Sequence, residues 1–178
     1  CLINKLGIKD EEKLRNFEAA VTFAKISEIE NGFMDFPLTA EGYRSIHRFI
    51  FEDIYDWAGE YRKVDISKKG TVFASYKSVD SLMKNCFKRL SDHNYFKDIP
   101  LNNYLENITD LYNTLNMIHP FREGNGRTQR TFISLLARFS GHFADFSKVD
   151  EDELMIATIQ AAGGVHDQLI RVFSRIII

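Results

Sequence analysis

The chain has 178 residues, of which 44% are hydrophobic and 27% are charged, a balance typical of one globular domain with a sizeable core. Its formal net charge of -2 argues against a general nucleic-acid binder. Two cysteines are too few for a disulfide framework, and neither a signal peptide nor a membrane-spanning apolar run is present. We therefore expect a single domain over residues 1–178, in a reducing cytosol and without membrane contact. Because residue 1 is Cys1 rather than Met, we expect a longer gene product.

Apolar spacing predicts helices along most of the chain. Asp10 is expected to cap a first helix that Asn31 and Gly32 end. Thr39 is expected to cap a second helix, and the predicted inward face of that helix consists of Tyr43, Ile46, Ile50, Ile54 and Trp57. His47 falls beside this face, so we predict a structural role for it.

Residues 61–76 change in character. Val64 and Ile66 alternate with polar residues, an interruption follows at 67–70, and apolar residues return at 71–73. The pattern predicts a β-hairpin with Gly70 in its turn. An isolated hairpin is only marginally stable, so it must pack against the helices. It either fills a gap in the core or covers a functional site.

The remaining chain again predicts helices. Ser78 is expected to open a helix whose buried face includes Cys86, and apolar spacing continues over 101–118. A helix from about Asn125 ends near Gly141, and another begins after Asp150 with Glu153 as its capping-box partner. Gly163 and Gly164 precede the last helix; Gln160 and His166 border this break, where a solvated turn is favoured over nucleotide contact.

Residues 119–130 combine several chemically useful groups in one stretch. They are His119, Pro120, Phe121, Arg122, Glu123, Gly124, Asn125, Gly126, Arg127, Thr128, Gln129 and Arg130. Pro120 biases His119 away from helical geometry, which places His119 where a helix gives way to a loop. The free amides at the start of the next helix would bind an anion, and Arg127 and Arg130 would lie on one face beside it.

The same loop supplies a metal ligand and a base. Glu123 suits Mg2+, which proteins usually hold with one or two carboxylates plus substrate phosphates. His119 has an ordinary pKa close to operating pH and could take a proton from a hydroxyl. Each feature alone is common in structural loops, but their coincidence favours a site. No Gly-Lys-Ser/Thr follows the glycines, so this is not a Walker loop.

The stretch resembles the Fic-domain signature, His-x-Phe-x-Asp/Glu-Gly-Asn-Gly/Lys-Arg with a second arginine following, and residues 51–62 resemble family members as well. The resemblance implies His119 as base, Glu123 as Mg2+ ligand, and Gly124, Asn125 and Gly126 as anion hole. It implies Arg127 as γ-phosphate partner and Arg130 as a second phosphate-side arginine. With Gly126 at this position the sequence resembles the adenylylating branch of the family, because the related Doc-type kinases have Lys there.

The resemblance also implies a fold and an activity. The fold would be all-α, with about seven or eight helices and the hairpin as a flap over the active-site cleft. The flap would align a target segment by strand addition, and Lys69 and Gly70 in its turn would border the nucleotide. The activity would be Mg2+-dependent transfer of AMP from ATP to a Ser, Thr or Tyr hydroxyl of a target protein, with release of pyrophosphate. Cell filamentation, toxin activity and a bacterial origin, with delivery to a host cell as one variant, are associated with such proteins.

Two alternatives stay open. The same loop could transfer another phosphate-linked group, such as UMP, phosphocholine or a phosphoryl group. A more distant alternative is a non-enzymatic helical interaction module.

The family's inhibitory motif, Ser/Thr-x-x-x-Glu-Gly/Asn, is not matched. Ser27 and Glu30 approximate it with a spacing one residue short. We therefore predict that Arg127 is free and that a small antitoxin-like protein, or a C-terminal piece, inhibits the enzyme. Glu30 as an internal inhibitor is the weaker alternative.

Overall fold

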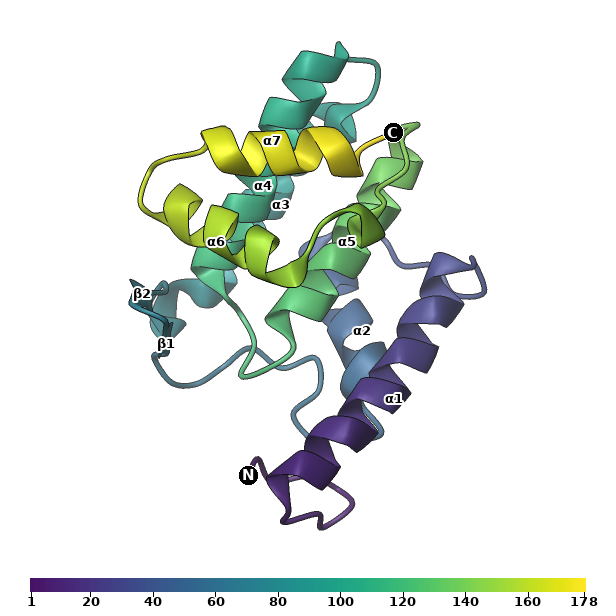
Figure 1. Ribbon diagram of the computed structural model, residues 1–178, viewed down its shortest axis with the longest axis vertical. Coiled ribbons are helices and arrows are strands. Elements are labelled where there is room, and N and C mark those ends of the chain that lie inside the picture. The colour runs from purple at the N-terminus through teal and green to yellow at the C-terminus, as the bar shows by residue number, and fades with distance from the viewer.

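The computed structural model describes residues 1–178 as seven α-helices, three short 3-10 helices and one two-stranded hairpin (Figure 1). The α-helices are α1 (Glu11–Glu30), α2 (Ala40–Phe51), α3 (Val79–Asp92), α4 (Leu101–Ile118), α5 (Asn125–Phe139), α6 (Glu151–Ala162) and α7 (Asp167–Ile176). The strands are β1 (Ser67–Lys68) and β2 (Thr71–Val72), and the 3-10 turns are Tyr76–Ser78, Asn94–Phe96 and Phe146–Lys148. The predicted all-α class with one small hairpin is confirmed.

Helices α4 and α5 form the centre of the bundle. Helix α4 packs against α3, α5, α6 and α7, while α5 also packs against α1 and α2. The loop joining α4 to α5 lies at one end of the bundle, and the hairpin projects from the side beside it (Figure 1). No helix combines the length and the apolar character needed to cross a membrane.

Two of the predicted helix starts are confirmed by their capping hydrogen bonds. The Asp10 side chain accepts from the Lys13 N–H at 2.9 Å, and Thr39 Oγ1 accepts from the Gly42 N–H at 3.0 Å. Asp150 also caps α6, but the predicted return bond from Glu153 is absent, because that carboxylate pairs with Arg175 instead. Ser78 stands at the N-cap of α3 without a side-chain capping bond.

The prediction that the second helix extends to Trp57 is wrong. Helix α2 ends at Phe51, and Ile54 is buried from the irregular segment that follows. The segment is held by bonds outside α2: the Lys5 N–H donates to the Ile54 carbonyl at 2.8 Å, and the Gly59 N–H donates to His47 Nδ1 at 2.8 Å. The apolar residues thus keep a helical spacing as far as Trp57, although the helix itself ends at Phe51.

The hairpin is shorter than predicted and shifted. Ser67 and Lys68, which we expected to interrupt it, are the residues of β1, and they pair with Val72 and Thr71. The turn consists of Lys69 and Gly70, both with positive φ (47° and 82°), as a two-residue hairpin turn of type I′ requires. The predicted position of Gly70 is confirmed.

Candidate active site

A cavity of about 450 Å³ lies where the hairpin, the end of α4, the start of α5 and the helix α6 meet. This volume is in the range of small-molecule sites, about 300–1,000 Å³. The cavity brings together most of the predicted site residues: His119, Glu123, Asn125, Gly126, Arg127, Arg130 and Lys69. Gly124 and Gly70 lie next to them in the chain but do not line the cavity.

Buried contacts beneath the loop fix its shape. The Phe121 ring is fully buried and stacks on His47, with ring centroids 3.8 Å apart, so Phe121 anchors the loop on the core. His47 Nδ1 accepts from the Gly59 N–H, so its Nε2 carries the proton and donates to the Glu123 carbonyl at 3.0 Å. His47 therefore supports the loop, in agreement with its predicted structural role.

The Asn125 side chain is used within the loop. Its Oδ1 accepts from the Phe121 N–H at 2.9 Å, and its Nδ2 donates to the Phe121 carbonyl at 2.8 Å. The amide group is thus committed to the loop, and only the backbone N–H of Asn125 remains for an anion.

The orientation of His119 leaves one ring nitrogen for chemistry. His119 ends α4 in the left-handed region, at φ 47° and ψ 63°, so its predicted departure from helical geometry is confirmed. Its Nδ1 lies 3.2 Å from the Asn116 carbonyl, which can only accept, so Nδ1 carries the proton. The ring stacks on Phe73 after the hairpin at 3.9 Å. Nε2 is left as an unprotonated acceptor.

Burial keeps His119 neutral. Desolvation lowers the pKa of His119 to about 4, and the charges of Lys68 and Arg62 act in the same direction, against the hydrogen bond to the Asn116 carbonyl. At neutral pH the ring is therefore unprotonated and able to accept a proton, although it is a weaker base than the histidine of ordinary pKa that the sequence led us to expect.

The start of α5 has backbone N–H groups that are free to bind an anion. The first helical hydrogen bond runs from the Thr128 N–H to the Gly124 carbonyl, so the N–H groups of Asn125, Gly126 and Arg127 precede the helix ladder. Gly124 has φ 80°, and a Cβ there would lie 2.3 Å from the Phe51 ring. A Cβ at Gly126 would meet only Arg130 Nη1, at 3.5 Å. Gly124 is therefore required by the fold, whereas Gly126 leaves space over the anion site.

The prediction that Arg127 is free is wrong. Its guanidinium forms an ion pair with Glu18 on α1 and donates to Thr22 Oγ1 at 3.1 Å. The Glu18 carboxylate also accepts from the Tyr55 hydroxyl, and the guanidinium lies 4.8 Å from the centroid of the Phe51 ring. A helix far away in sequence thus holds this arginine in place.

Glu30 is not the partner of Arg127 or of Arg130. Its carbonyl accepts from Arg138 Nη2 at 2.7 Å near the other end of α5. The weaker alternative, inhibition through Glu30, has no contact in this structure to support it.

The other charged residues predicted to bind the nucleotide or the metal ion have fewer side-chain partners than Arg127. Arg130 lines the cavity and has only the exposed Glu151 nearby, with 3.6 Å between Nη2 and Oε1. Glu123 forms no ion pair, and its Oε1 accepts from the Gly124 N–H at 2.9 Å. No cluster of three metal-binding side chains exists, so a cation here would take its other ligands from phosphates and water, as Mg2+ commonly does. Lys69 Nζ lies 2.8 Å from Met155 Sδ, across the cavity mouth.

Sequence reasoning missed the wall formed by α6. Leu154, Met155, Thr158 and Ile159 line the cavity opposite the loop, whereas Gln160 and His166 do not. The helical spacing of these residues indicates a buried face but not what it faces. Only the fold shows that α6 packs against α4 and lines the same cavity as the hairpin.

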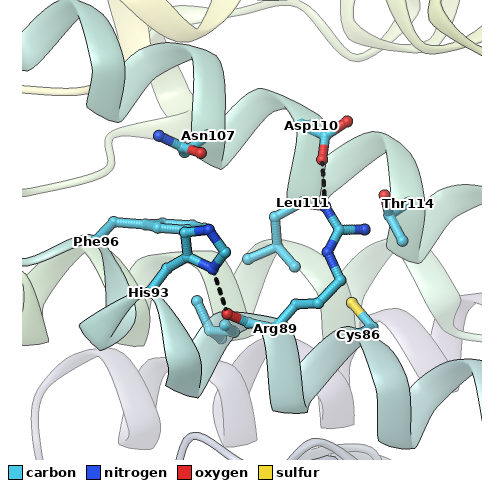
Figure 2. Close-up of a pocket in the computed structure, with 9 residues that line it drawn as sticks. Cys86, Arg89, His93, Phe96, Asn107, Asp110, Leu111 and Thr114 are labelled. Atoms are coloured by element: carbon cyan, nitrogen blue, oxygen red, sulfur yellow. Dashed lines mark hydrogen bonds and ion pairs between the residues drawn. The ribbon is translucent and has the colours of Figure 1, made fainter.

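A second hollow lies between α3 and α4, where Cys86, Arg89 and His93 face Asn107 and Asp110 (Figure 2). His93 Nδ1 binds the Arg89 carbonyl at 2.7 Å, and Arg89 lies 3.7 Å from Asp110. The cavity volume of about 40 Å³ suits a few water molecules. Burial raises the pKa of the Cys86 thiol to about 11, so Cys86 is an unreactive core residue, as predicted.

Comparison with known proteins agrees with this geometry. The model of the Fic/DOC family matches residues 37–137. The chain is 33% identical over 166 residues to the protein adenylyltransferase VbhT of Bartonella schoenbuchensis, covering 93% of this chain and 35% of that protein. It is 30% identical over 165 residues to the probable protein adenylyltransferase y4lH of Sinorhizobium fredii, covering 92% of this chain and 84% of that one. The chain thus spans about a third of one relative and most of the other.

Solved structures share the architecture. The BepC protein of Bartonella tribocorum, a VirB-translocated effector solved with bound AMPPNP, superposes with a TM-score of 0.93 at 27% identity. The similarity covers 99% of this chain and 92% of BepC.

Proposed function

Because the chain belongs to the Fic/DOC family, we propose that it is a protein adenylyltransferase, which moves AMP from ATP to a hydroxyl group of another protein. The observation that carries the proposal is the neutral His119. Its Nε2 is left as an acceptor in the same cavity that holds the α5 anion site and Arg130. A base and a phosphate site within one cavity are what this transfer needs.

Different residues would hold the phosphates, the metal ion and the base of the nucleotide. The N–H groups of Asn125, Gly126 and Arg127, together with Arg130, would hold the phosphates of ATP. Glu123 would hold Mg2+, which neutralises phosphate charge when it is bound. The apolar part of α6 would receive the base of the nucleotide.

The chemical step is a displacement at the α-phosphorus. His119 Nε2 takes the proton of the target hydroxyl, and the hydroxyl oxygen forms a bond to the α-phosphorus. The bond from the α-phosphorus to the bridging oxygen breaks, and pyrophosphate leaves with that oxygen. Fixed charge around the phosphates, rather than a covalent enzyme intermediate, supplies most of the acceleration.

The hairpin would position the acceptor. Lys68, Lys69 and Thr71 line the cavity from this side, and the exposed edge of a two-stranded sheet can pair with an extended target segment. The acceptor is a Ser, Thr or Tyr side chain of a protein in the bacterial cytosol or in a host cell. A small inhibitor protein that acts in trans also remains a proposal.

The test compares ATP labelled at the α-phosphate with ATP labelled at the γ-phosphate, in bacterial and host-cell lysates. We expect a labelled protein band only with the α-label, and loss of that band with His119→Ala or after chelation of divalent cations. A band with the γ-label would show phosphoryl transfer instead. No band with α-labelled ATP, together with a band when α-labelled UTP is supplied, would show a different donor.

A further inference from the structure

Arg62 lies fully buried between the hairpin and the catalytic end of α4, with none of its side chain exposed. We propose that Arg62 is a positioning residue that fixes the acceptor-binding hairpin and His119 relative to each other, an inference that rests on the proposed function.

One guanidinium group joins three segments. Its Nε donates to the His119 carbonyl at 2.8 Å, and its Nη2 donates to the Ile118 carbonyl at 3.2 Å. On the hairpin side, Nη1 donates to the Val64 carbonyl at 2.8 Å and Nη2 donates to the Ala74 carbonyl. Val64 precedes β1 and Ala74 follows β2, so Arg62 binds both ends of the hairpin and the histidine at once.

Backbone hydrogen bonds complete this junction. The Arg62 N–H donates to the Pro120 carbonyl at 2.8 Å, and the Ala74 N–H donates to the Met117 carbonyl at 3.0 Å. The hairpin is thus tied to residues on both sides of His119.

The charge of Arg62 is satisfied by carbonyl groups rather than by an acid. The nearest carboxylate is Asp65, at 3.7 Å and with 66% of its side chain exposed. Carbonyl groups at the end of a helix carry partial negative charge, which favours a cation there. A lysine has one nitrogen and no planar fork, so it could not reach carbonyl groups on both sides of the junction.

The functional consequence is geometric. The hairpin would hold the target hydroxyl and His119 would take its proton, and the reacting atoms must come within about 3–3.5 Å. A misplacement of about 1 Å can cost roughly 100-fold in rate. A rotation of the hairpin against α4 would produce such a misplacement even with every catalytic residue intact.

The experiment compares Arg62→Lys with Asp65→Asn, which removes the charge of the nearest carboxylate but keeps the oxygen that accepts from the Tyr76 N–H. For Arg62→Lys we expect kcat for AMP transfer to fall roughly 100-fold, with a higher KM for the target and an unchanged Kd for ATP. Asp65→Asn should stay within about twofold of the wild type. A kcat within threefold of the wild type in folded Arg62→Lys would overturn the proposal, as would a loss confined to the Kd for ATP.

Two measurements do not depend on activity. Histidine NMR should show His119 with its proton on Nδ1 in the wild type and in Asp65→Asn. In Arg62→Lys it should show a signal averaged between the Nδ1-protonated and the Nε2-protonated forms of the ring. An unchanged signal in Arg62→Lys would count against the proposal even if no target were ever modified, which separates this inference from the proposed function.

Amide exchange in the wild type covers the case in which Arg62→Lys does not fold. The Arg62 and Ala74 N–H groups should exchange together and slowly, because they belong to one junction. Fast exchange at Ala74 beside a protected Arg62 would show that the hairpin moves independently, and would refute the proposal.

Discussion

At the scale of single residues, the protonation of His119 decides whether it can act as a base. Its pKa is lowered to about 4, so it loses its proton above that pH and stays neutral through the physiological range. We expect the kcat/KM of AMP transfer to fall only as the pH drops towards 4 and to be flat near neutrality. The measurement is a pH–rate profile of the wild type, beside His119→Ala, which should lose roughly 10²-fold to 10⁴-fold at every pH. A midpoint near 6.5 would contradict the role given to burial.

Two glycines of the loop should respond in opposite ways to the same substitution. In Gly124→Ala the new methyl group meets the buried Phe51 ring and φ is positive, so we expect a loss of about 3 kcal/mol in the free energy of unfolding. In Gly126→Ala the methyl group has space and alanine favours the helix, so stability should be unchanged or higher, by up to about 1 kcal/mol.

The activity of Gly126→Ala should nevertheless fall, because the methyl group occupies the cavity above the α5 amides. Denaturant unfolding and AMP-transfer assays on the two variants measure both effects. Equal stability of the two variants would show that the Phe51 contact does not restrict position 124.

At the scale of elements, the ion pair between Glu18 and Arg127 couples α1 to the stretch 119–130. Only 13% of the Glu18 side chain and 25% of the Arg127 side chain are exposed, so breaking the pair leaves a poorly solvated charge. We expect Glu18→Gln to lower both thermal stability and transfer rate, and to have much less effect when Arg127 is already alanine. A double-mutant cycle measures this coupling.

The matched control is Lys25→Gln, which breaks the pairing of α1 with Glu52 and Asp53 without touching the loop. It should show no coupling to Arg127→Ala. A large rise in activity in Glu18→Gln would mean that Glu18 holds Arg127 away from ATP, and the chain would then contain its own inhibitor.

The elements also show what the sequence could and could not reveal. The loop 119–130 could be singled out as a candidate site because its histidine, its carboxylate and the start of the next helix are contiguous, and the start of α5 at Asn125 agrees with the prediction. Glu18 could not be found, since it meets Arg127 across 109 positions of sequence and belongs to no local pattern. The end of α2 was misjudged because Ile54 is buried from a non-helical segment, where burial produces the same apolar spacing. Nothing in the sequence distinguished Arg62 from the other charged residues near the hairpin.

At the scale of the whole molecule, stability should depend on the protonation of His47. Its Nδ1 accepts the Gly59 N–H, so a second ring proton has no place in the folded state, and burial lowers the pKa of His47 to about 4. In the unfolded chain this histidine binds a proton near pH 6.5. Between these pH values the unfolded state holds more protons, so the free energy of unfolding falls as the pH is lowered.

We therefore expect the wild type to lose about 2 kcal/mol between pH 7 and pH 5 through His47 alone, with His119 adding to the loss in the same direction. Urea unfolding at a series of pH values measures the slope. His47→Gln should be less stable at pH 7, since it cannot reproduce both ring hydrogen bonds, but its stability should depend less steeply on pH. His166→Gln, at the turn before α7, is the matched control and should keep the wild-type slope. A slope that is the same in the wild type and in His47→Gln would mean that the histidine under the loop is not what makes the fold sensitive to acid.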